Sequence, residues 1–240
     1  MKQFILTSAT VLASIASSSA AVIQFDFGQN TQTTADVGWN NMTGSNGATP
    51  NNITDAVDSA GVATTIDLSY AEFGGSDSGV AGTARNYVGP YPAAVSGQAA
   101  NALLDVIFSR DSAVQFTLSD LDPAKTYDLL LYGSTNRAGI SDYTVTGGGG
   151  ASTISLVTSE WTSGLGGTPN ATDVALFTGI APNGSNQITI DMVSNNTANP
   201  NVPRGFAVIN TLVVSEVVPE PSSTLLVGLG ALGLMGRRRR

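Results

Sequence analysis

Short runs in which apolar and polar residues alternate recur along most of this chain, separated by clusters of Gly, Asn, Pro and Asp. In segments 112–118 and 187–192 every second residue is apolar, the pattern of a strand with one buried face. The strand-like runs are 22–27, 62–70, 113–118, 127–132, 143–146, 152–157, 173–178, 187–192 and 206–214. Many short strands bounded by turn residues predict an all-β fold, an antiparallel β-sandwich of the jelly-roll type.

One segment, 95–107, has Ala and Leu spacing that fits a helix or a helical turn. No internal repeat of fixed period interrupts the strand pattern, which argues against a solenoid or a propeller.

The chain contains no His and no Cys. This excludes disulfides, Cys or His zinc sites, thiol nucleophiles and Ser-His-Asp triads. Of the 10 basic and 18 acidic residues, segment 22–216 holds five and seventeen, so its formal charge is −12. Nucleic acid is therefore not an expected partner, because phosphate binding needs clustered Lys and Arg.

The N-terminal segment, 1–21, has the composition of a secretory signal peptide. A single Lys precedes the apolar stretch 4–15, and small residues fill 17–21. We expect passage through the Sec translocon and removal by signal peptidase after Ala20 or Ala21. The alternative, an amphipathic first helix, is disfavoured because the apolar stretch has no polar stripe.

The C-terminal segment combines an uncharged apolar run, 222–236, with four terminal basic residues: Arg237, Arg238, Arg239 and Arg240. As a helix this run spans roughly 22 Å, which is less than the roughly 30 Å hydrocarbon core of a bilayer. We predict a short transmembrane helix whose arginines stay on the cytoplasmic side, which places the preceding domain outside the cell membrane.

The residues Val218, Pro219, Glu220 and Pro221 directly precede that apolar run. The order of Pro-Glu-Pro, short apolar helix and Arg cluster resembles the PEP-CTERM sorting signal of bacterial exported proteins. This resemblance covers 217–240. It implies recognition by an exosortase, cleavage near the Pro-Glu-Pro motif, and delivery of the domain to the cell surface or the exopolysaccharide matrix. An ordinary single-span membrane anchor is the alternative.

Two parts of the central domain, 23–28 followed by 39–41 and 118–129 followed by 132–134, are similar to those of galactose-binding-like and malectin-like jelly-roll domains of bacterial exported proteins. The resemblance implies carbohydrate binding by loops at one edge of the sandwich. The sequence thus divides into a signal peptide at 1–21, a β-sandwich domain at 22–216 and a sorting signal at 217–240.

The expected ligand-binding residues are Trp39, Arg85, Tyr87 and Tyr91, in segments rich in Gly, Asn and Pro. Aromatic rings at such positions can stack on sugar faces while polar groups bond to hydroxyls. The alternative for Trp39, and for Trp161, is that these rings close the ends of the sandwich core.

The acidic composition also suits Ca²⁺, which prefers carboxylate and carbonyl oxygens. Asp26 and Asp191 are the candidate ligands, and the alternative is ordinary solvation at strand edges. No other cofactor is expected.

The sequence predicts an exported surface or matrix component whose sandwich binds carbohydrate or acts structurally. We assign no catalytic residue and expect no enzymatic activity. A glycosidase that uses two carboxylates is one alternative, although the central domain has only three Glu residues. An ice-binding or surface-binding protein is another, but the Thr residues do not form a regular array.

Overall fold

The structure is a computed structural model that describes residues 20–73, 78–81, 90–110, 112–163, 166–195 and 206–217. Its elements are, in chain order, β1 (Val22–Gln29), β2 (Trp39–Gly44), β3 (Asp67–Phe73), β4 (Ser78–Ala81), the 3₁₀ turn η1 (Asn101–Leu103), β5 (Val106–Ser109), β6 (Ala113–Ser119), β7 (Thr126–Tyr132), β8 (Gly139–Gly147), β9 (Gly150–Ser163), β10 (Gly166–Pro169), β11 (Ala175–Ile180), β12 (Ile188–Ser194), β13 (Ala207–Ile209) and β14 (Thr211–Val217).

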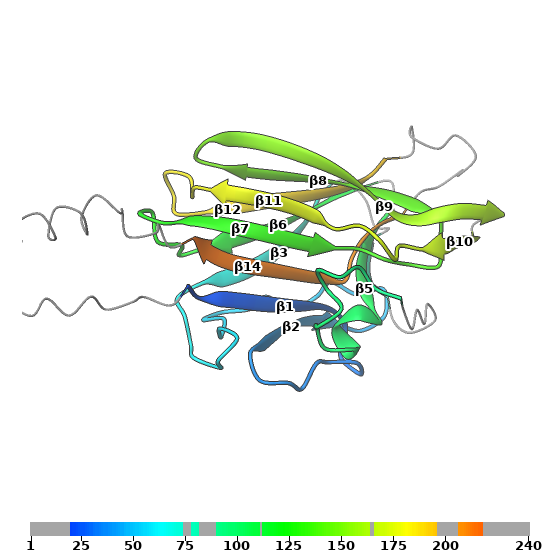
Figure 1. Cartoon of the computed structure of the whole chain (residues 1–240), viewed down its shortest axis with the longest axis horizontal. Coiled ribbons are helices and arrows are strands. Elements are labelled where there is room, and N and C mark those ends of the chain that lie inside the picture. Colours follow the sequence, from blue (N-terminus) through cyan, green and yellow to red (C-terminus); the bar gives the residue numbers. More distant parts are fainter. Residues whose placement is uncertain are drawn as a thin grey trace, which may run out of the picture.

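Two large sheets are stacked face to face (Figure 1). One has the strand order β11-β7-β14-β1-β2 and the other β10-β9-β8-β12-β6-β3. Apart from the edge strands β2, β3 and β10, the two sheets contain eight strands: β1, β6, β7, β8, β9, β11, β12 and β14. Numbered along the chain, they have the order 1-8-3-6 in one sheet and 2-7-4-5 in the other, which is the arrangement of a jelly roll. The predicted all-β sandwich is therefore confirmed.

The core lies between the two sheets and consists of the apolar residues that alternate along the strands. Phe27 of β1 and Phe116 of β6 meet across the core, with ring centroids 5.0 Å apart and no exposed surface. Strand β12 pairs antiparallel with both β6 and β8, and its alternate residues Ile188, Ile190 and Met192 lie in the core. This alternation is the feature that the sequence displays in segments 112–118 and 187–192.

Three details differ from the sequence prediction. Strand β2 pairs with β1 in parallel, although its Asn-rich residues suggested a loop. The segment 95–107 forms only the three-residue turn η1 before it enters β5, rather than a longer helix. A small third sheet, β13-β5-β4, lies beside the two large ones.

The outer face of the five-stranded sheet is partly covered by the segment that precedes β5. Val95 and Leu103 pack against Tyr132 of β7, and all three side chains are buried. The side chains that lie beneath this segment are therefore shielded from water although they point away from the main core.

Both described ends of the chain leave the sandwich at the same end. Val22 of β1 pairs with Ser215 of β14, and Val217 pairs with Thr126 at the start of β7. The signal peptide and the sorting tail lie outside the described residues, apart from Ala20, Ala21 and Val217. Within the described ranges, no helix has the length and apolar character needed to cross a membrane.

Candidate functional site

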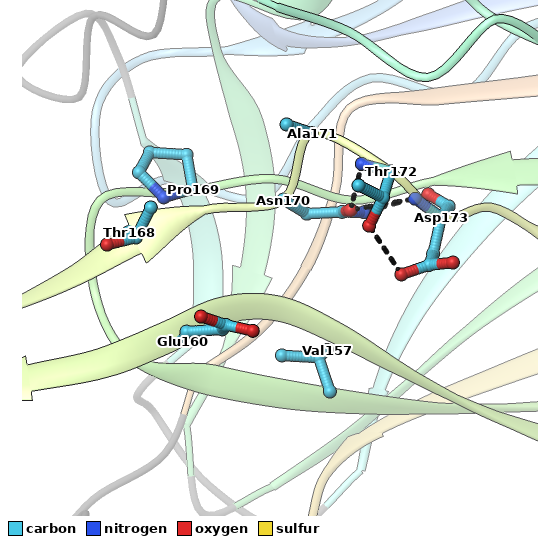
Figure 2. A pocket seen from close by; sticks show the side chains of 8 residues that line it. All are labelled: Val157, Glu160, Thr168, Pro169, Asn170, Ala171, Thr172 and Asp173. Atoms are coloured by element: carbon cyan, nitrogen blue, oxygen red, sulfur yellow. Dashed lines mark hydrogen bonds between the residues drawn. The ribbon is translucent and has the colours of Figure 1, made fainter.

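A pocket of about 200 Å³ lies where β9, β10 and the turn before β11 meet (Figure 2). Its lining combines acidic, hydroxyl, amide and small apolar side chains: Val157, Glu160, Thr168, Pro169, Asn170, Ala171, Thr172 and Asp173. The residues come from two neighbouring strands and the turn that follows them.

An irregularity in β9 places two of these side chains on one face. Gly139 pairs with Ser159 and Ile140 with Val157, so Thr158 is an extra residue without a partner in β8. Such a bulge shifts the alternation of a strand by one residue. Val157 and Glu160 are consequently both exposed beside the pocket, while Thr158 is buried.

Asn170 fixes the shape of the turn that forms the other wall. Its side-chain oxygen accepts hydrogen bonds from the backbone amides of Thr172 and Asp173, at 3.1 and 3.0 Å. Its amide nitrogen donates to the carbonyls of Gly133 and Asp173, at 3.1 and 2.8 Å. The hydroxyl of Thr172 also donates to the carboxylate of Asp173, at 2.7 Å (Figure 2). The buried Asn170 thereby holds two exposed polar side chains in place.

The pocket offers hydrogen-bonding groups to a polar ligand. The carboxylates of Glu160 and Asp173 accept hydrogen bonds, and the hydroxyls of Thr168 and Thr172 both donate and accept them. Four pocket residues with polar side chains are exposed, so these groups are open to a molecule that enters from solvent. The sequence showed these residues only as polar strand and turn positions, because their convergence depends on the bulge in β9.

The aromatic residues predicted to bind a ligand do not form one cluster in the described structure. Trp39 opens β2 and is half-buried. Tyr91 is half-buried against Tyr132 of β7, with ring centroids 6.4 Å apart and an angle of 84° between the planes. Strands β14 and β1 separate β7 from β2. Arg85 and Tyr87 lie outside the described residues.

Trp161 lies in β9, directly after Glu160, and not in a loop. Its side chain is 40% exposed, so it does not close the end of the core. It is also not part of the pocket lining.

The two candidate calcium ligands face opposite sides of the sandwich. Asp26 alternates with the core residues Phe25 and Phe27 and points to the outer face of the five-stranded sheet. Asp191 points to the outer face of the six-stranded sheet and accepts a hydrogen bond from Gln115 at 2.7 Å. The structure therefore does not bring this pair together.

Asp26 has a different acidic neighbour, Asp105, for which no pattern in the sequence indicated a role. Both side chains are buried, with 1% of each exposed. Burial raises the pKa of both carboxyl groups, and the charge of Asp26 raises that of Asp105 further.

Residues 217–240 match the family described as the PEP-CTERM protein-sorting motif. The resemblance that the sequence displays at this end is thereby confirmed. The residues of the motif itself, from Val218 to Arg240, lie outside the described structure. A comparison with curated proteins found no match.

Among solved structures, the chain is similar to TmCBM61 in complex with β-1,4-galactotriose. The identity is 11%, over 61% of this chain and 86% of that chain, with a TM-score of 0.34. It is also similar to the enzymatically active domain of bacteriophage CBA120 tailspike protein 4. In that case the identity is 13%, over 61% of this chain and 19% of the tailspike chain, with a TM-score of 0.33. At these TM-scores neither likeness bears on function.

Proposed function

We propose that this chain is a carbohydrate-binding component of the bacterial cell surface or exopolysaccharide matrix, and that the pocket between β9 and the turn before β11 is its binding site. The sorting motif at 217–240 marks the chain as an exported protein that is processed by an exosortase. The proposal adds a role for the sandwich after export, which is carbohydrate binding, and a position for the binding site on its surface.

The observation that carries the proposal is the composition of the pocket. Carboxylates and hydroxyls converge with the small apolar surfaces of Val157, Pro169 and Ala171. A sugar offers both hydroxyls and apolar ring faces, so it can use both kinds of surface. The volume of about 200 Å³ is below the roughly 300–1,000 Å³ of sites for drug-sized ligands. It suits one sugar unit at the end or the edge of a longer polysaccharide.

The position of the pocket also supports a binding role. The described ends of the chain leave the sandwich beside Thr126, at the start of β7. The pocket turn precedes Ala175, whose neighbour Leu131 is near the other end of β7. About 17 Å of strand separate Thr126 from Leu131, at roughly 3.4 Å per residue. A domain held by its C-terminal tail would thus present the pocket away from the point of attachment (Figure 1).

We propose binding rather than hydrolysis at this site. A glycosidase needs a carboxyl group whose surroundings keep it protonated so that it can act as the acid, and this is commonly achieved by burial. Glu160 and Asp173 are both exposed. The chain also has no His to act as an alternative base.

A glycan array probed with the full chain in detergent tests the proposal. We expect binding to a bacterial or plant polysaccharide that weakens at least tenfold in Glu160→Gln and in Asp173→Asn. Trp39→Ala is the matched control, because Trp39 lies on an edge strand far from the pocket, and its binding should be unchanged. Equal binding by wild type and both pocket variants would place the site elsewhere. Release of shorter sugars from the bound polysaccharide would show that the chain hydrolyses it, which would contradict a role in binding alone.

The processing step is tested separately by changing Pro219 and Pro221 to Ala and measuring the mass of the exported protein. Proline fixes an extended backbone and keeps a cleavage segment out of the following helix. We expect the variant to keep its C-terminal tail and to stay in the membrane fraction. Release with an unaltered mass would show that the Pro-Glu-Pro motif does not direct cleavage.

A further inference from the structure

A second polar site lies on the outer face of the five-stranded sheet, apart from the pocket. Asp26 of β1 and Asp105, which directly precedes β5, are buried there beneath the segment that covers the sheet. The two carboxylates come from distant parts of the chain but are close enough for their charges to interact. Two carboxyl groups in such a place must be either protonated or matched by a positive charge.

Asp105 lies directly over the backbone of β1. Its carboxylate accepts a hydrogen bond from the backbone amide of Gln29. It also occupies the space above Gly28, where any Cβ atom would overlap the carboxylate. Gly28 and Asp26 are two residues apart and point to the same face of the strand. The two carboxylates therefore lie next to each other along β1.

Two buried hydroxyls lie beside this pair. Thr211 of β14 is directly opposite Asp26 in the sheet and points to the same outer face. Thr34 donates its backbone amide to Asp26 at 3.0 Å, and its hydroxyl lies beside the same carboxylate without forming a hydrogen bond of normal geometry. Thr34 is 3% exposed and Thr211 is fully buried.

Each of these four side chains has an oxygen atom without a hydrogen-bond partner in the chain: Asp26 Oδ1, Asp105 Oδ1, Thr34 Oγ1 and Thr211 Oγ1. Buried polar atoms are nearly always paired, because an unpaired one costs about 1–3 kcal/mol. Four such oxygens around one pair of carboxylates indicate a bound ligand that all four oxygen atoms coordinate.

The elements around the site are held by side-chain hydrogen bonds. Asn41, which pairs with Asp26 in β2, accepts from the amide of Thr34 at 2.7 Å and donates to its carbonyl at 3.0 Å. Asn210 donates to the carbonyl of Asp105 at 2.8 Å and accepts from the amide of Ser134 at 2.7 Å. The oxygen atoms are thus positioned without any contribution from a ligand.

No basic side chain balances the two carboxylates within the described part of the chain, where the ion pairs found all involve Lys125. The described residues also contain no group of three or more Asp, Glu, His or Cys that could hold a metal ion. A cation here would thus be held by two carboxylates and by neutral oxygens. Such a donor set consists of hard ligands only.

We propose that Asp26, Asp105, Thr34 and Thr211 form a binding site for one Ca²⁺ ion. Its two positive charges match the two carboxylates. Ca²⁺ takes 6–8 oxygen ligands in flexible geometry, so water or backbone carbonyls complete the set, whereas Mg²⁺ requires a nearly ideal octahedron. Zn²⁺ and Cu²⁺ prefer nitrogen and sulfur ligands, and the chain contains no His and no Cys to supply them.

The bound ion would join four separate segments of the fold. These are β1, the loop after it, the segment that leads into β5, and β14. Because Asp105 follows the covering segment that holds Val95 and Leu103, the ion would hold this segment against the sheet. The proposal does not depend on carbohydrate binding, since the pocket is on the other side of β7, at the β9–β11 edge.

Titration of the calcium-free full chain in detergent with CaCl₂ tests this site by calorimetry and thermal unfolding. Extracellular calcium modules bind with dissociation constants of roughly 0.1–1 mM. With such an affinity, 5 mM Ca²⁺ raises the Tm by about 2–9 °C for a domain of this size. We expect one ion per chain and a smaller rise with 5 mM Mg²⁺. Absence of a calcium-dependent rise in the wild type would overturn the proposal, and so would an equal rise with Mg²⁺.

Variants locate the ion. Asp26→Asn and Asp105→Asn should each abolish the calcium-dependent rise, whereas Asp191→Asn and Asp173→Asn, which change carboxylates elsewhere, should keep it. Thr211→Val tests the site without removing a charge, and a three- to tenfold weaker affinity is expected. If the rise persists in both Asp26→Asn and Asp105→Asn, the ion binds elsewhere. The same conclusion follows if the two carboxylate variants do not fold and Thr211→Val binds calcium as the wild type does.

Discussion

Replacing Asn170 by Ala removes the side chain that shapes the proposed sugar pocket. Asn170 makes four hydrogen bonds to the backbone, two as donor and two as acceptor. Its own backbone carbonyl accepts from the hydroxyls of Tyr132 and Ser134, and these bonds persist in the variant. The effect of the substitution is therefore confined to the turn that leads to Asp173.

The magnitude follows from the burial of the groups that lose a partner. Gly133 is buried, so its carbonyl would be left without this donor at a cost of about 1–3 kcal/mol. The backbone amides of Thr172 and Asp173 and the carbonyl of Asp173 are near the surface, where water replaces Asn170 as their partner. The loss of each of these three hydrogen bonds should therefore cost about 0.5 kcal/mol. The sum is about 2.5–4.5 kcal/mol, or a decrease of roughly 5–18 °C in Tm for a domain of this size.

Urea unfolding followed by tryptophan fluorescence measures this change, and the glycan array measures its effect on binding. Thr172→Val is the matched control, because it removes only an exposed hydrogen bond and should cost less than about 0.5 kcal/mol. Asn170→Asp keeps the two acceptor bonds but loses the donors, so it should also destabilise the protein. A loss below about 0.5 kcal/mol in Asn170→Ala would refute the assignment of Asn170 as the residue that holds the turn.

Three further predictions concern the scaffold. Phe116→Ala, which empties a fully buried site between two other aromatic rings, should cost about 3–5 kcal/mol in urea unfolding. Gly139→Ala would place a Cβ against a backbone carbonyl oxygen and should lower the Tm, whereas Gly149→Ala, where the space is open, should leave it within about 2 °C; equal Tm values would contradict the geometry at Gly139. Lys125→Met removes a 2.9 Å ion pair with Glu216 at the surface and should cost about 0.2–1 kcal/mol, a difference that 1 M NaCl should reduce.

The sequence was sufficient to predict the strands whose two faces have different surroundings. In β6 and β12 every second residue enters the core, and the intervening residues meet solvent or a polar neighbour. Burial on one face then leaves a period of two in the sequence, and this pattern reveals the strand without any knowledge of its partners. The C-terminal sorting motif was also recognisable, because its three parts follow one another directly in the chain.

Elements that depend on distant partners were not predictable in the same way. Strand β2 consists largely of polar residues. The side chain of Asn40 can be buried because its amide nitrogen donates hydrogen bonds to the carbonyls of Gln24 and Val57. The Ala and Leu residues of 95–107 gave a helical pattern, but Val95 and Leu103 are used to cover a sheet face. In both cases tertiary contacts outweigh local preference.

The two proposed sites could not be read from the sequence for the same reason. Glu160 lines the same pocket as Asp173 only because one extra residue in β9 turns it outward, and Asp105 meets Asp26 only because the covering segment folds back over β1. Composition indicated an acidic protein with Ca²⁺ as a candidate ligand, but it could not show which carboxylates are buried together. The structure separates the acidic residues into two sets with different chemistry. The exposed residues Glu160 and Asp173 can exchange water for sugar hydroxyls at little cost, whereas a buried pair such as Asp26 and Asp105 carries both of its negative charges only beside a compensating positive charge. Export brings such a chain into surroundings where calcium modules of millimolar affinity operate, so the proposed ion would hold the sandwich together after the chain has left the cell, while the pocket remains available for carbohydrate.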